Sequence, residues 1–131
     1  MRALFASLLC LTLMACSFDL WSSTPPVYVV FFEGKSPDLT PDAKDIIGKA
    51  AVKARLKPGA MVQIAGPSTK VAPGYDPSLA QPRIDAVVAQ LLADGVDKDK
   101  LVQTSLTDKP IAGDLTGAER VEIRVLDAPN S

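Results

Sequence analysis

The sequence predicts an α/β fold: a two-layer sandwich of βαβαββ order, with helices packed on one face of a mixed sheet. Two strand-like apolar runs are each followed by a segment with helical periodicity, and two further strand-like runs come after them. The length of 131 residues and the hydrophobic content of 47% suit one domain of ordinary size.

The first strand and the first helix are predicted on either side of a turn-rich loop at residues 34–39. Residues 27–32 (VYVVFF) are β-branched and aromatic without a break, which is typical of a strand buried on both faces. Thr40, Pro41 and Asp42 supply a cap, a first-position proline and an acid for the first turn of the helix. Apolar residues then recur at helical spacing: Ala43, Ile46, Ile47, Ala50 and Ala54.

Lysines line the other side of this helix at steps of four residues, at Lys49, Lys53 and Lys57. Asp45 precedes Lys49 in the order that favours an ion pair along a helix. We interpret the row as a solvated face, and a surface for a partner is the alternative.

The second half of the chain repeats the strand–helix order. Pro58 and Gly59 end the first helix, and residues 61–66 (MVQIAG) predict a strand. A second amphipathic helix is predicted from apolar residues at helical spacing: Ile84, Val87, Val88, Leu91 and Leu92.

Asp94 and Gly95 end the second helix, and two short strands complete the sheet. Residues 101–105 form one, and residues 121–126 form the other with alternating apolar and charged side chains. Residues 106–117 form a long loop between them.

The first residues have the features of a signal sequence. Arg2 is followed by an apolar run that is too short to span a membrane as a mature helix, and Leu13-Met14-Ala15-Cys16 stands where such a segment is cleaved. This ending resembles the lipobox of bacterial lipoproteins. The resemblance implies that Cys16 becomes the first mature residue and carries acyl chains, palmitate among them. A plain secretory signal with an incidental Cys16 is the alternative.

Residues 16–26 are predicted to be a short tether. Pro25 and Pro26 lack an amide donor and hold the chain extended. Trp21 has two equal interpretations: it lies at the membrane interface, or it packs on the domain. Because Cys10 leaves with the signal and Cys16 is lipidated, no thiol is left for a disulfide.

Several pieces together resemble the OmpA-like C-terminal domain family. The opening VYVVFFEGKSPDLTPDAKDII has that family's strand, loop and Leu-Thr-Pro helix start. Tyr75-Asp76-Pro77-Ser78-Leu79 and Arg83 fall where the family has its Tyr-Asn-x-x-Leu-Ser-x-x-Arg helix. Gly95-Val96-Asp97 and Arg120-Val121-Glu122-Ile123 match its Gly-Val-Asp turn and its Arg-Arg-Val-Glu-Ile strand.

The resemblance implies the fold above and non-covalent binding of peptidoglycan. In that family an aspartate of the loop and an arginine of the next helix bind the diaminopimelate of the stem peptide, one charge each. Arg83 matches the arginine, but the aspartate position falls at Thr69 or Ser68. Asp76 lies two helical turns before Arg83, and we hypothesise that it replaces the missing acid.

Pro82 bears on this geometry, because it lacks the amide that would bond back to Ser78. The helix then starts at Asp76, which puts Asp76 and Arg83 on one face, or at Gln81. The structural alternative is that Asp76 caps the helix or pairs with Arg83, and that the loop only connects two elements. A third interpretation is that the same concavity binds a different ligand.

Other chemistry has little support, and we expect no enzyme. The chain has no histidine, so Ser68, Ser78 and Ser105 have no base of that kind to activate them. Asp94, Asp97 and Asp99 lack the rest of a calcium loop, and we interpret them as turn and cap residues. The balance of 14 basic and 15 acidic residues gives no footprint for nucleic acid, and no cofactor or metal site is predicted.

The sequence is therefore divided into a lipoprotein signal peptide (1–15), a lipidated cysteine with its tether (16–26), an OmpA-like domain (27–126) and a tail (127–131). We expect a protein lipid-anchored on the periplasmic face of the outer membrane that binds the peptidoglycan stem peptide and links that membrane to the cell wall. The alternative is an adapter of an envelope machine, with envelope proteins as partners, that keeps the fold but has lost the site.

Overall fold

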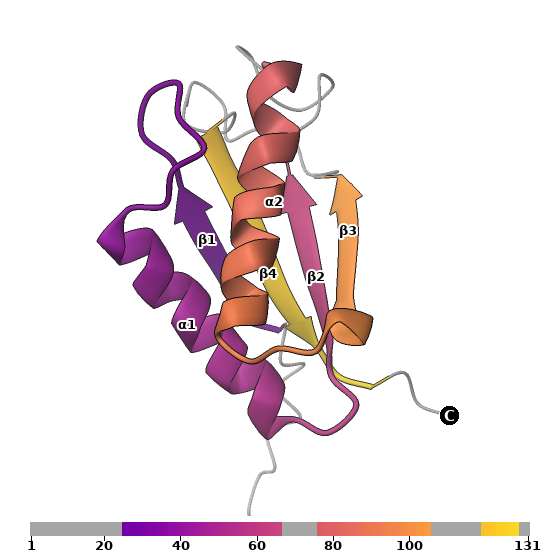
Figure 1. Cartoon of the computed structure of the whole chain (residues 1–131). Helices are drawn as coiled ribbons and strands as arrows, with labels where there is room; N and C mark the ends of the chain where they lie inside the picture. The colour runs from indigo at the N-terminus through magenta and orange to yellow at the C-terminus, as the bar shows by residue number, and fades with distance from the viewer. Residues whose placement is uncertain (1–24, 67–75, 106–118, 129–131) are drawn as a thin grey trace, which may run out of the picture.

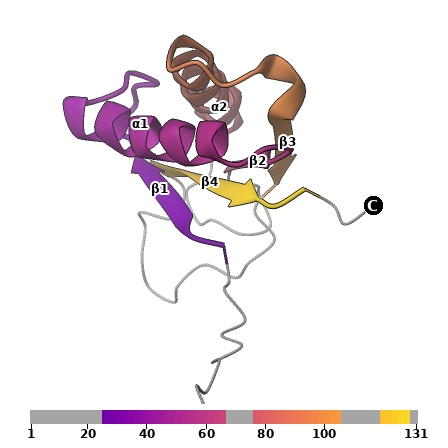
Figure 2. The same ribbon diagram turned by 90° about the horizontal axis from the view of Figure 1, so that it is seen from below.

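The computed structural model describes residues 25–66, 76–105 and 119–128, which form two layers (Figure 1). The elements are β1 (Val27–Phe31), α1 (Pro41–Leu56), β2 (Met61–Gly66), α2 (Pro77–Ala93), the 3-10 turn η1 (Lys98–Lys100), β3 (Leu101–Ser105) and β4 (Arg120–Leu126). Seen from below, both helices lie on one face of the sheet (Figure 2). The predicted α/β sandwich and its βαβαββ order are confirmed.

The sheet is mixed and has the strand order β1-β4-β2-β3. β4 pairs antiparallel with both β1 and β2, and β3 pairs parallel with β2. The last strand of the chain thus lies between the first two. Neither α1 nor α2 has the length and apolar content that a membrane crossing requires.

β1 is an edge strand, and only one of its faces is well covered, so the expectation that residues 27–32 are buried on both faces is wrong. Val30 is fully buried, whereas Val27 and Phe31 keep 40% and 51% of their surface exposed. Val30 pairs with Val121 of the core, and its side chain faces the helices. The side chains directly before and after Val30 point to the opposite face, because successive side chains of a strand alternate between the two faces of the sheet. An unbroken apolar run suggests cover on both sides, but here both helices lie on the same side.

α1 begins as its sequence predicts. The backbone N–H of Ala43 donates to Thr40 Oγ1 at 3.1 Å, and Pro41 and Asp42 occupy the first turn. Asp45 and Lys49 form the expected exposed ion pair, with 2.7 Å between Oδ2 and Nζ. Lys57 instead pairs with Asp127 beyond β4, at 2.5 Å.

α2 begins at Pro77 with Asp76 as its cap, so the alternative start at Gln81 is wrong. Pro82 lies inside the helix on its exposed side, where the missing amide removes a single bond to the first turn. The helix ends at Asp94 as predicted, and Gly95 follows with a φ of 91° that favours glycine. Leu92, placed in the predicted apolar stripe, is 40% exposed.

The core fills the space between the helices and the sheet. Its largest fully buried side chains come from both layers: Ile47, Ile64, Leu91, Ile123, Val30, Val62, Val87, Val121 and Val125. α2 approaches the end of β2 closely, because Gly66 offers no side chain there. A Cβ on Gly66 would lie 2.4 Å from Cδ1 and 2.9 Å from Cγ1 of Ile84.

We predict that Gly66→Ala lowers the free energy of unfolding by about 1–3 kcal/mol, because Ile84 or the whole of α2 must shift. Urea unfolding followed by circular dichroism measures the effect. Adding Ile84→Val, which removes Cδ1, should restore part of the loss.

Gly48→Ala is the matched control, since the nearest atom to its added Cβ is Asp94 Oδ2 at 3.9 Å. Gly48 lies inside α1, so alanine should stabilise the protein by roughly 0.5–1 kcal/mol. The close packing of α2 on β2 is contradicted if both alanine variants have the parent's stability.

Candidate functional site

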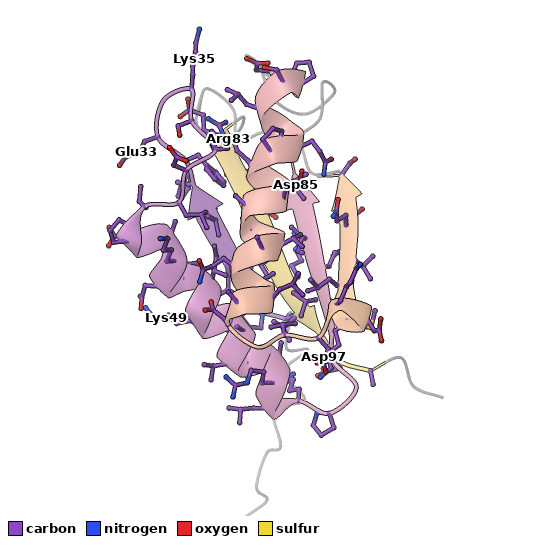
Figure 3. The ribbon with its side chains drawn as sticks, viewed as in Figure 1. Glu33, Lys35, Lys49, Arg83, Asp85 and Asp97 are labelled. Atoms are coloured by element: carbon purple, nitrogen blue, oxygen red, sulfur yellow. The ribbon has the colours of Figure 1, made fainter. Side chains whose placement is uncertain are left out.

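Arg83 is a buried cation that joins α2 to the loop between β1 and α1 (residues 32–40, the β1–α1 loop). Only 4% of its surface is exposed. Its Nη2 donates to the carbonyl oxygen of Gly34 at 2.7 Å, and its Nε donates to that of Ser36 at 3.2 Å. Figure 3 shows Arg83 reaching from α2 toward this loop, with Lys35 at the loop's tip.

Phe32 and other residues of the loop also lie near the guanidinium or its acceptors. The Arg83 Cζ atom lies 5.2 Å from the centroid of the Phe32 ring, within range of a cation–π contact. Ser36 Oγ donates to Asp38 Oδ2 at 2.8 Å and accepts from the Asp38 backbone N–H at 3.0 Å. Gly34 has a φ of 57°, which lets its carbonyl turn toward Arg83 at little cost. The arginine is thereby held in one orientation.

Asp76 caps α2 at the same end of the helix. Its Oδ1 accepts from the Ser78 backbone N–H at 2.9 Å and from Ser78 Oγ at 2.6 Å. These hydrogen bonds lower the pKa of the Asp76 carboxyl below its usual 3.8, with smaller contributions from the charges of Lys35 and Arg83. Asp76 is therefore an exposed, fully ionised carboxylate at neutral pH.

Asp76 caps α2, and Arg83 lies two helical turns further along the same helix. They do not play the same part there. Arg83 is buried against backbone carbonyls, whereas Asp76 is exposed and directs its bonded oxygen toward its own helix. Opposite charges in that order suit a ligand that carries an ammonium and a carboxylate.

Other predicted residues lie elsewhere. Ser68, Thr69 and Cys16 fall outside the described residues. Asp94 caps the end of α2 and accepts from Gln90 Nε2 at 3.0 Å, while Asp97 precedes η1 and Asp99 lies within it. In the described parts of the chain, no three His, Cys, Asp or Glu side chains are grouped so as to hold a metal ion.

Sequence reasoning missed the residues that hold Arg83. Gly34 and Ser36 are 49 and 47 positions away along the chain, so no spacing rule connects them to the helix. Phe32 reads as the last residue of a strand, and Lys35 as an ordinary loop lysine. The only available signal was Gly34 itself, a turn residue directly after a strand.

No family model matches the sequence, and neither does any curated protein. Solved structures are similar. The OmpA-like domain of FopA1 from Francisella tularensis has a TM-score of 0.56 and 17% identity, covering 79% of this chain and 75% of that one. The periplasmic domain of Helicobacter pylori MotB has a TM-score of 0.56 and 24% identity, covering 77% and 73%.

The peptidoglycan-associated lipoprotein from Burkholderia pseudomallei is a third similar structure, with a TM-score of 0.56 and 21% identity. The match covers 76% of this chain and 88% of that one. The chain therefore has the fold of OmpA-like domains, as its sequence motifs predict.

We predict that Arg83→Met lowers the free energy of unfolding by about 2–4 kcal/mol, because two charge-assisted hydrogen bonds from a buried guanidinium are lost. Urea denaturation gives the value. Arg55→Met is the control, since Arg55 is exposed and reaches Asp94 O only at 3.5 Å; its effect should stay within about 0.5 kcal/mol. Equal effects of the two variants would show that the hydrogen bonds from Arg83 to Gly34 and Ser36 do not stabilise the fold.

We also predict that Asp76 makes stability depend on acid pH. Its folded-state pKa lies below 3.8, so the ionised form stabilises the folded chain above that pH. This contribution is lost as the pH falls through the folded-state pKa. Asp76→Asn keeps a capping oxygen without the charge. Urea midpoints measured from neutral to strongly acid pH should fall less steeply for the variant, and parallel curves would disprove the assignment.

Proposed function

We propose that this protein is an outer-membrane lipoprotein whose OmpA-like domain associates with peptidoglycan and so links the membrane to the cell wall. Two similar structures support a location in the cell envelope, since one is named as a periplasmic domain and the other as a peptidoglycan-associated lipoprotein. The lipid would be attached to Cys16 at the end of the signal sequence. The several acyl chains of a bacterial lipoprotein cysteine make such attachment effectively permanent.

The ligand we propose is the diaminopimelate of the stem peptide, which carries both charges. Arg83 would attract its carboxylate, and Asp76 would take its ammonium in place of the loop acid that Ser68 or Thr69 replaces. The observation that carries this proposal is the pairing at one end of α2 of a fixed guanidinium with an exposed, ionised carboxylate. A fixed cation loses little entropy when it binds.

A second candidate is a non-binding adapter or structural subunit of an envelope machine. The contacts of Arg83 and Asp76 favour this candidate, because each side chain has a structural role without a ligand. The Arg83 guanidinium donates to two backbone carbonyls, and Asp76 caps α2. In this case the arginine is retained for the fold, and neither proposal makes the protein an enzyme.

Co-sedimentation with purified sacculi tests the proposal on the lipid-free chain from residue 17 on, which contains the whole described core from Val30 to Val125. The parent should pellet with the sacculi. Asp76→Asn should weaken binding roughly tenfold, because the cap survives and only the charge is lost. Asp85→Asn removes a charge from the same helix without facing Arg83's loop, and it should bind as the parent does.

Thr69→Asp adds the acid that the family pattern has at this position. If the site binds diaminopimelate, this variant should sediment more strongly than the parent. If neither the parent nor Thr69→Asp pellets while both stay folded, the domain is a scaffold and the adapter is the better account. Arg83→Lys should bind more weakly than the parent, and its folding must be verified, because a lysine lacks the planar fork.

A further inference from the structure

The outer side of α1, which faces away from the sheet, carries two neighbouring apolar side chains. Val52 and Leu56 keep 52% and 76% of their surface exposed, more than any other large apolar side chain in the described part of the chain. They are four residues apart and therefore lie on the same side of the helix. The core is formed by the opposite side of α1, with Ile47, Ala50 and Ala54. The protein thus keeps an apolar stripe in contact with solvent.

Cations border this stripe on both sides. Lys49 and Lys53 follow one side at a spacing of four residues. Arg55 lies on the other side, toward α2, where it donates to the carbonyl oxygen of Asp94 at 3.5 Å. The α1 patch is defined as Lys49, Val52, Lys53, Arg55 and Leu56.

The surroundings of the α1 patch leave it with an excess of positive charge. From Lys49 to its cap at Lys57, the helix has four basic residues and no acid. Two carboxylates reach them, since Asp45 pairs with Lys49 and Asp127 pairs with Lys57. Four cations and two carboxylates leave an excess of two positive charges. The Asp45–Lys49 pair is exposed, and such pairs contribute little free energy, so Lys49 can turn to a stronger anion.

The α1 patch lies toward the end of the domain at which the chain enters the sheet. Figure 1 shows the last turns of α1 and the start of β1 toward the same end. The candidate site lies at the other end, since Arg83 and Lys35 are near the top of Figure 3 and Lys49 is lower on α1. The patch and the candidate site can therefore contact two different surfaces at the same time.

We propose that the α1 patch contacts an anionic phospholipid surface. A helix that lies on a bilayer sinks its apolar side chains into the headgroup–acyl boundary and keeps lysine and arginine near the phosphates. The long cationic side chains reach outward while their methylene stems cover apolar surface. The stripe of Val52 and Leu56, with cations on both sides, has this arrangement. It also lies on the convex side of a helix, which suits a yielding lipid surface.

This inference goes beyond the proposed association with peptidoglycan and does not depend on it. The α1 patch shares no residue with the site around Arg83 and Asp76. Two apolar side chains and a small excess of charge make a weak contact. A lipid anchor on the same chain would strengthen that contact by raising the local concentration of membrane.

Vesicle flotation tests the inference on the lipid-free chain from residue 17 on. The chain should bind vesicles of equimolar phosphatidylglycerol and phosphatidylcholine, and it should not bind vesicles of phosphatidylcholine alone. Leu56→Ser should weaken binding roughly tenfold, because less apolar surface leaves water. Lys53→Gln with Arg55→Gln should weaken it at least as much and should make the remaining binding less dependent on salt.

Leu92→Ser and Lys98→Gln are the matched controls, and both should bind as the parent does. Leu92 is 40% exposed on α2, and Lys98 is exposed in η1, which lies across α2 from α1 (Figure 1). Circular dichroism should show that all variants stay folded, because each replaced side chain is at least partly exposed.

A dye at position 56 tests the contact by a second measurement. The chain from residue 17 on has no cysteine, so the Leu56→Cys variant can carry a single environment-sensitive dye. Its emission should shift to the blue when the mixed vesicles are added. The same dye on the Leu92→Cys variant should not respond.

Several results would overturn the proposal. One is binding that Leu56→Ser and Leu92→Ser reduce equally, and another is equal binding to vesicles with and without phosphatidylglycerol. A dye at position 56 that responds to protein concentration instead of vesicles would show that a second copy covers the patch. Loss of vesicle binding with intact sedimentation on sacculi would remove this inference alone.

Discussion

The packing of α2 against the β1–α1 loop depends on the hydrogen bonds from Arg83 to the carbonyls of Gly34 and Ser36. They connect α2, from the middle of the chain, to the loop that links β1 to α1. Because Arg83 is buried, loss of these acceptors would leave its guanidinium with fewer hydrogen bonds away from water, which makes the contact costly to break.

Arg83 has a structural role and, in our proposal, a ligand-binding role as well. A residue that fixes a loop and also faces a ligand has two reasons to be present, and its loss disturbs both. Asp76 differs because its capping role requires an oxygen, whereas the recognition role proposed for it requires a charge. The Asp76 carboxylate is therefore the residue at which folding and the proposed recognition can be separated, even though Arg83 is the residue that resembles the family motif.

Local chemistry made much of the fold predictable from the sequence. The Thr40 cap, the Asp45–Lys49 pair and the Asp94–Gly95 helix end each involve residues within four positions of one another. The edge position of β1 and the partners of Arg83 depend on contacts between residues far apart in the chain. Hydrophobic runs do not reveal which face of a strand is covered, and spacing does not reveal which carbonyl an arginine will reach.

The central place of β4 has a consequence for how the chain folds. β1 has β4 as its strand partner, with Val27 opposite Arg124, so the first strand has to wait for nearly the last residues to be synthesised. Closing so long a loop makes folding slow compared with a helical bundle of the same size. A chain that stops short of residue 120 would expose unpaired edges on both β1 and β2, and such edges promote aggregation.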